Sequence, residues 1–313
     1  MRDDFMQEVF FGFLVKGQLR AALAYLGRFP GQSELYKKYM ARFQEERYAV
    51  YGVEEDLNRI LLAYQKYYRE SFYLELPPEE AAGRLGERLA KLLGAAAGTP
   101  LDRLEEDWAE AFRRRSLYIL TGRTGDWYGP YLWREEETRR YTVELPEGTR
   151  EYAVKLLDGF LMKSWLDYLS FGAAGTGGWS NGGGLIHCVR SAYDLDSESF
   201  RVSLLKHEAQ HGADLEKYPG ITPADLEYRG KLVELIYTRE RPLLGDFLLQ
   251  AGPSGGSHGV AAERIAQRLM ECLDLRREEL SALPAEEVRA ASLEIFRRST
   301  AEMDQKYRQP RDS

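Results

Sequence analysis

Apolar residues recur at steps of three and four through residues 1–116, the spacing that places them on one face of an α-helix. Proline and glycine interrupt this pattern at Pro30-Gly31, Pro77-Pro78 and Gly94. The intervening segments predict helices over residues 5–29, 33–48, 53–73, 78–93 and 101–117. Because short connections join them, we expect antiparallel hairpins packed side by side, so residues 1–116 are predicted to form a helical bundle.

Beyond this region the pattern changes between strand-like and helix-like segments. Residues 118–120 and 141–145 are rich in β-branched and aromatic residues, and residues 185–190 are mainly apolar; all three predict strands. A helix is predicted over residues 149–169, where apolar residues follow helical steps: Val154, Leu157, Leu161, Trp165 and Tyr168. The chain is therefore predicted to be α+β and mostly helical, with a second, mixed domain at residues 117–313.

Candidate chemistry enters with a predicted helix over residues 197–216, whose apolar stripe includes two histidines. His207 and His211 enclose Glu208 in an H-E-x-x-H motif. Residues four apart on a helix lie one above the other, so both imidazoles can reach one metal ion. Glu208 lies one position round the helix, close enough to contact a water molecule at the metal without being a ligand. This arrangement predicts a Zn²⁺ site with an open coordination position.

A catalytic zinc site needs a third protein ligand, and the next helix offers two candidates. Thr222 and Pro223 predict the start of that helix, with threonine as the N-cap and proline at the first position. Glu227 follows sixteen residues after His211, and Glu234 lies seven residues further on nearly the same face. From spacing alone, both carboxylates stay open as the third ligand.

With its H-E-x-x-H helix and the acidic helix that follows, the chain resembles the gluzincin branch of zinc metallopeptidases, which includes thermolysin-like enzymes. The resemblance covers residues 180–260 and implies a zincin-like domain with one zinc ion. It implies His207, His211 and Glu227 as ligands and Glu208 as the catalytic base. It favours Glu227 over Glu234, because the family's glutamate lies early in its helix and is followed by small or polar residues.

The same resemblance implies two further features of the site. The strand before the active-site helix, here residues 185–190, would form the edge of the sheet and pair with an extended peptide. A downstream histidine or tyrosine would hold the reaction's oxyanion. His258 is the candidate, since it lies at the end of an irregular segment rich in glycine and proline, residues 239–259, and precedes a predicted helix at residues 260–273. The alternatives lie on the ligand-bearing helix: Tyr228, Arg229 and Tyr237.

These features predict a zinc-dependent peptidase that hydrolyses peptide bonds with Glu208 as the general base. The alternative is a non-catalytic, zincin-like regulatory or binding protein whose helical half recruits a protein partner. The presence of Glu208 argues against this alternative, because a protein that no longer turns over substrate has no use for that base.

Charge, cysteine count and the length of apolar runs indicate the cellular compartment and the classes of partner. The chain of 313 residues has a net charge of −7, which argues against a nucleic-acid partner. Two cysteines are too few for a disulfide framework. The apolar run at residues 9–15 is too short to span a bilayer, and it lacks a cleavage-site pattern. We therefore expect a cytoplasmic protein that acts on a peptide or protein substrate and has no membrane partner.

Overall fold

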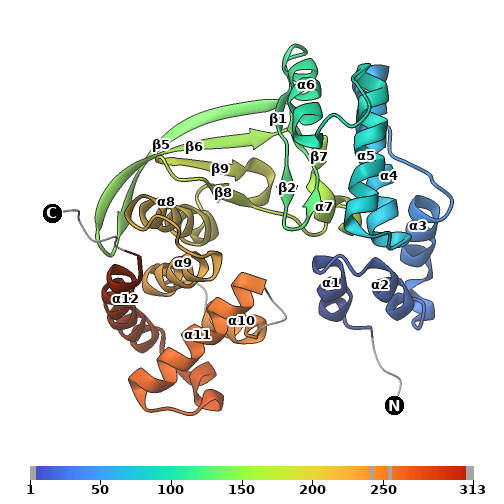
Figure 1. The fold of residues 1–313 in the computed structure, drawn as a ribbon. Helices are drawn as coiled ribbons and strands as arrows, with labels where there is room; N and C mark the ends of the chain where they lie inside the picture. The colour runs from blue at the N-terminus through green and yellow to red at the C-terminus, as the bar shows by residue number, and fades with distance from the viewer. Residues whose placement is uncertain (1–4, 240–242, 253–255, 308–313) are drawn as a thin grey trace. The chain divides into compact units, whose positions relative to one another are not determined.

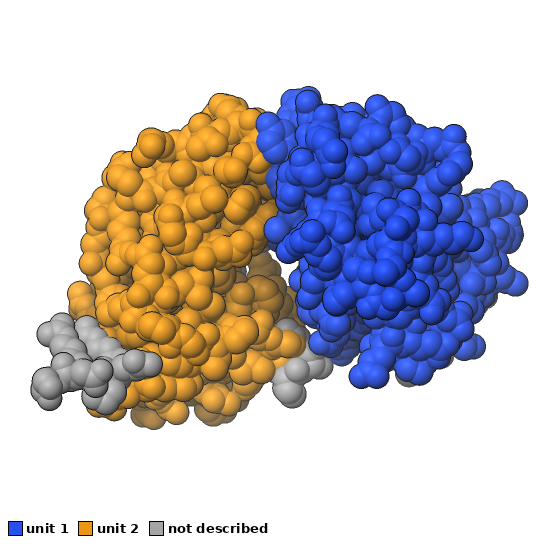
Figure 2. Space-filling view, turned by 45° about the horizontal axis from the view of Figure 1, so that its top comes forward, with its two compact units in different colours: residues 1–135, 158–176 blue, residues 136–157, 177–313 orange. Residues whose placement is uncertain are grey.

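The computed structural model describes residues 5–239, 243–252 and 256–307, and helices predominate over small sheets (Figure 1). The α+β, mostly helical class predicted from the sequence is confirmed. The chain divides into two compact units (Figure 2). Unit 1 comprises residues 1–135 and 158–176, and unit 2 comprises residues 136–157 and 177–313.

Helices fill the first part of unit 1: α1 (Gln7–Val15), α2 (Leu19–Leu26), α3 (Ser33–Phe43), α4 (Glu55–Tyr68), α5 (Pro78–Leu93) and α6 (Leu101–Arg113). A π-helical turn, Arg69–Tyr73, extends α4. The single helix predicted over residues 5–29 is wrong, because Gly17 adopts a φ of +69° and separates α1 from α2. A Cβ atom there would lie 2.9 Å from ring atoms of both Phe72 and Trp127, so the break is also required by packing.

Short strands complete unit 1. Strands β1 (Tyr118–Leu120), β4 (Tyr131–Trp133) and β7 (Met162–Lys163) form an antiparallel sheet, β2 (Arg123–Thr124) pairs with β3 (Trp127–Tyr128), and α7 (Ser164–Ser170) follows. Their aromatic side chains join the helical core: the ring of Trp127 lies 5.1 Å from that of Phe72 and 4.8 Å from that of Trp165. This packing explains why unit 1 extends beyond residue 116, where the sequence analysis divides the chain.

Unit 2 is built on a four-stranded sheet covered by helices. The strand order is β5 (Glu135–Leu145), β6 (Gly148–Asp158), β9 (Leu185–Val189) and β8 (Gly178–Ser180), with β6 and β9 parallel. Helix α8 (His207–Lys217) lies below this sheet and α9 (Pro223–Tyr237) lies below α8 (Figure 1). The remaining helices pack around α9: α10 (Leu243–Gln250), α11 (Gly256–Leu273) and α12 (Ala285–Tyr307).

Two predictions that concern the sheet of unit 2, one of a helix and one of a sheet edge, are corrected. The helix predicted over residues 149–169 is wrong, because its first half is strand β6, where burial alternates along Tyr152, Val154 and Leu156. Val154 and Leu157 therefore mimic a helical step by chance. The prediction that residues 185–190 form the sheet edge is also wrong, because β9 lies between β6 and β8 and the glycine-rich segment supplies the outer strand.

The segment predicted to be irregular before His258 contains helix α10. Its apolar residues Leu243, Leu244 and Phe247 are buried, at the spacing of one helix face. Pro242, Pro253 and Gly255, which suggested a loop, lie outside the described residues. Across the described ranges, no helix is both long and apolar enough to cross a membrane.

Candidate metal centre

Helix α8 presents both histidines of the H-E-x-x-H motif on one buried face. A π-helical stretch, Ser199–Lys206, leads into α8, and its Phe200 and Leu204 are buried beneath the sheet. The imidazole rings of His207 and His211 lie 4.3 Å apart between centroids. Candidate ligand atoms of these histidines and of Glu208 all lie within 4.8 Å of one another. The helix and the convergence of the motif predicted from the sequence are therefore confirmed, and the group is a possible metal site.

Helix α9 begins as predicted and lies directly against the two imidazole rings. Thr222 caps it by accepting a hydrogen bond from the backbone N–H of Asp225, and Pro223 is its first residue. Gly230 faces the histidines: a Cβ atom there would lie 2.7 Å from Cε1 of His207 and 2.8 Å from Nε2 of His211. Only glycine allows α9 to approach α8 this closely, and this approach brings the acidic residues of α9 to the rings.

The two ring nitrogens of His207 face different carboxylates on α9. Nδ1 lies 2.7 Å from Oε1 of Glu234, whereas Nε2 lies 3.4 Å from Oε2 of Glu227. Burial disfavours a protonated ring, but the hydrogen bonds to Glu227 and Glu234 outweigh it and raise the pKa of His207 to about 10. In the absence of a metal, a proton on His207 therefore balances part of the negative charge that α9 brings to the site.

Nε2 of His211 lacks a carboxylate partner of this kind among the described residues. Its Nδ1 lies 3.4 Å from Oε2 of Glu208, but its buried Nε2 has no hydrogen-bond partner among the described residues. A buried polar atom without a partner costs free energy unless a ligand satisfies it. Burial opposes ionisation of Glu208, but the contact with His211 outweighs it and holds the pKa of Glu208 below its usual value. The Glu208 carboxylate is thus in its basic form at neutral pH.

His258 joins the group from a third helix, α11. Its Nδ1 lies 2.8 Å from Oε2 of Glu227, and its side chain remains 61% exposed. Burial opposes ionisation of Glu227, but its contacts with His207 and His258 hold the pKa of its carboxyl well below the usual range. The structure thus brings all five residues singled out from the sequence to one place: His207, Glu208, His211, Glu227 and His258.

The donor set fits a zinc ion. Zinc prefers histidine nitrogen and carboxylate oxygen at about 2.0–2.2 Å in tetrahedral geometry, which puts neighbouring ligand atoms about 3.3–3.6 Å apart. The separation of 3.4 Å between Nε2 of His207 and Oε2 of Glu227 matches that value. The unpartnered Nε2 of His211 needs a cation or a donor. The hydrogen bond that Glu234 accepts from Nδ1 of His207 suits a carboxylate that orients a ligating imidazole.

Behind the site, an ion pair that the sequence analysis did not anticipate joins the two helices. The guanidinium of Arg229 is fully buried and contacts Oδ2 of Asp214 at 2.8 Å. It also donates to Ser299 on α12 at 2.9 Å and to Glu147 at 2.9 Å. Arg229 is therefore engaged in holding α8, α9 and α12 together, which argues against its alternative role as an oxyanion donor. The sequence signal was weak, because neither residue belongs to the motif.

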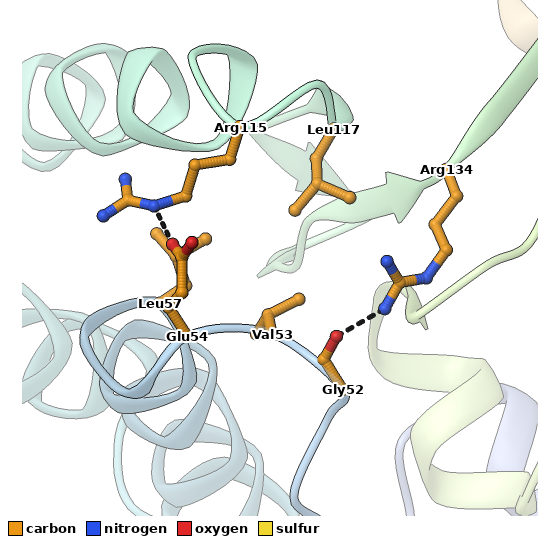
Figure 3. A pocket seen from close by; sticks show the side chains of 7 residues that line it. All are labelled: Gly52, Val53, Glu54, Leu57, Arg115, Leu117 and Arg134. Atoms are coloured by element: carbon orange, nitrogen blue, oxygen red, sulfur yellow. Dashed lines mark hydrogen bonds and ion pairs between the residues drawn. The ribbon is translucent and has the colours of Figure 1, made fainter.

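A hollow of about 420 Å³ in unit 1 provides a contrast (Figure 3). Arg115 forms ion pairs there with Glu54 and Asp56, and Arg134 donates to the carbonyl of Gly52 at 2.6 Å. The guanidinium groups are thus satisfied within the unit. The lining residues include no histidine or cysteine: Gly52, Val53, Glu54, Leu57, Arg115, Leu117 and Arg134. This hollow offers no counterpart to the metal centre.

Comparisons with protein-family models, with curated proteins and with solved structures found no match for this chain.

Proposed function

We propose that this protein is a zinc-dependent peptidase. The observation that carries the proposal is the buried group on α8 and α9, in which the unpartnered Nε2 of His211 lies beside His207 and an ionised Glu208. In the proposal, His207 and His211 ligate one zinc ion through Nε2, and Glu227 is the third ligand. Glu234 then orients His207 through Nδ1.

When bound, the zinc ion would polarise a water molecule and the scissile carbonyl. The carboxylate of Glu208 is the general base: it accepts a proton from the attacking water and returns it to the leaving amine. Its lowered pKa supports the first step, because the group must start ionised. His258 is assigned to the side of the site where the substrate's oxyanion develops, since its ring is exposed and close to Glu227.

The test is a comparison of wild type with Glu208→Gln on a peptide library at neutral pH. Glutamine keeps the shape of the side chain but cannot accept the proton, so we expect cleavage to fall ~10²–10⁴-fold while zinc content is unchanged. Glu216→Gln is the matched control, because Glu216 lies on the same helix and pairs with Arg150 at the surface.

Three outcomes decide the proposal. Loss of cleavage in Glu208→Gln, with zinc retained in all proteins, supports a peptidase. If wild type binds zinc but cleaves no peptide, the non-catalytic, zincin-like binding protein becomes the better explanation, and a protein partner of the helical half should be sought. If wild type takes up no zinc, both readings fail.

A further inference from the structure

We propose that His258 is a fourth protein ligand of the zinc ion in the resting protein, and that it leaves the metal when a substrate binds. This inference rests on the proposed zinc site and adds to it a means of regulation. In the resting protein His258 would bind the zinc ion. When a substrate carbonyl replaces it, the displaced ring would already lie close to the oxyanion that develops.

Nδ1 of His258 lies beside a carboxylate oxygen of the proposed metal site. Oε2 of Glu227 lies 3.4 Å from Nε2 of His207 and 2.8 Å from Nδ1 of His258. One carboxylate oxygen thus contacts two imidazole nitrogens. The separation from His207 matches the ~3.3 Å between neighbouring ligands of a tetrahedral zinc ion, whereas the shorter separation from His258 would have to lengthen by about half an ångström on metal binding. In the metal-free protein Nδ1 of His258 is thus within hydrogen-bond distance of the oxygen that is proposed to bind the metal.

The backbone beside His258 is held in place by a hydrogen bond and close packing. The N–H of Gly252 donates to the carbonyl of Gly259 at 3.1 Å, and a Cβ atom on Gly259 would lie 2.3 Å from the carbonyl oxygen of Gly252. Gln250, at the end of α10, accepts a hydrogen bond from the buried Lys231 of α9 at 3.1 Å. The first turn of α11 is therefore linked through Gly252 and the end of α10 to the helix that bears Glu227.

The proposed ligands differ in how far their side chains are exposed. The side chains of His207, His211 and Glu227 are 8%, 10% and 15% exposed, whereas that of His258 is 61% exposed. Removing a buried ligand from the metal strands a polar group in the protein interior, but His258 would return to water. His258 is thus the ligand that a substrate carbonyl can replace at the lowest cost. A zinc ion with four protein ligands has no open position until that exchange occurs.

The chain contains four histidines, so each ring can be followed by NMR. The protein would be labelled with an NMR-active nitrogen isotope in histidine and loaded with an NMR-active cadmium isotope in place of zinc. We expect through-bond coupling between cadmium and three rings, those of His207, His211 and His258. His187 is the internal control, because its ring stacks on Trp179 at 4.9 Å on the sheet.

His258→Gln should remove one coupled signal and weaken zinc binding by at least about tenfold, as measured by competition with a chelator. His187→Gln should remove only the uncoupled signal. Adding acetohydroxamate, a small zinc-binding probe, should abolish the coupling of His258 and leave the other two rings coupled.

Coupling to only two rings would overturn the inference and make His258 a hydrogen-bond partner of Glu227, with the proposed peptidase intact. If all three rings stay coupled to cadmium in saturating acetohydroxamate, His258 does not leave the metal, and that part of the inference is wrong. Absence of coupling to any ring would overturn the zinc site as well.

Discussion

The interiors of the two units are built from different kinds of polar group. Unit 1 buries tyrosines whose hydroxyls bond within the unit: Tyr39 donates to the carbonyl of Leu169 at 2.8 Å, and Tyr67 accepts from the N–H of Tyr128 at 3.2 Å. Unit 1 also buries two carboxylates, those of Glu70 and Glu105, but unit 2 buries a larger set of charged and titratable side chains around α8 and α9: His207, His211, Asp214, Asp225, Arg229, Lys231 and Glu234.

This difference separates a stabilising interior from a functional one. A tyrosine contributes a large apolar ring and needs one hydrogen bond, so aromatic packing stabilises unit 1 at little electrostatic cost. Each buried charge in unit 2 costs several kcal/mol unless it is paired and hydrogen-bonded. A chain retains such groups where they position other charges, as they do beside His207 and His211. Three sets of variants test this difference between the buried polar groups of the two units.

The largest effect is expected from removing the cation behind the metal centre. Arg229→Met leaves Asp214 buried beside an apolar side chain, so we expect a loss of about 3–5 kcal/mol in the free energy of unfolding. The double variant Arg229→Met/Asp214→Leu should recover much of this loss, because no charge is then left unpaired. Denaturant unfolding of the three proteins measures it. An equal loss in single and double variants would show that packing, and not charge, dominates.

A smaller effect is expected in unit 1, where Glu105 is buried against the hydroxyl of Tyr64. Burial outweighs this hydrogen bond and raises the pKa of Glu105 from 4.5 to about 7. The folded state therefore binds the proton more tightly than the unfolded state, so stability is lost as pH rises from 4.5 through 7. Glu105→Gln should leave stability near pH 4.5 almost unchanged and increase it above pH 7, on the order of 3 kcal/mol.

Tryptophan fluorescence suits this measurement, because Trp108, Trp127, Trp133 and Trp165 lie in unit 1 and Trp179 alone lies in unit 2. Unfolding by urea at several pH values, with zinc removed throughout, gives the pH dependence of the difference. A stability difference that does not change with pH would mean that Glu105 does not titrate in this range.

The smallest effect concerns the orientation of His207. Glu234→Gln keeps a hydrogen bond to Nδ1 but removes the charge, so we expect zinc affinity to fall about 10–100-fold, equivalent to about 1.4–2.7 kcal/mol. Glu227→Gln removes a proposed ligand and should weaken zinc binding more. Chelator competition ranks the two variants. A larger loss in Glu234→Gln would exchange the roles of the two carboxylates.

The site was more predictable from the sequence than the sheet. His207 and His211 converge because residues four apart on a helix always share a face, and the Thr222-Pro223 start fixes where α9 begins. Strand β6 was mistaken for a helix because Val154 and Leu157 satisfy the helical spacing, while the burial alternation at Tyr152, Val154 and Leu156 is visible only once the sheet exists.

The contact between Arg229 and Asp214 was likewise hidden, since it depends on how α8 and α9 cross. Local periodicity thus predicts which residues share a helix face, but it does not predict which elements meet. For the same reason, the sequence left Glu227 and Glu234 open as ligands, and the structure shows that they face different nitrogens of His207.

The course of the chain through the two units bears on how the protein is made. Unit 1 contains residues 158–176, which are synthesised after the β5–β6 hairpin of unit 2. Helices α1–α6 therefore leave the ribosome before Trp165, an aromatic partner of Phe72, exists. We expect the nascent helices to expose apolar surface until α7 has emerged, which makes them a candidate for chaperone binding during synthesis. The residues of the candidate metal centre appear later still, because His207, His211 and His258 follow α7 in the chain.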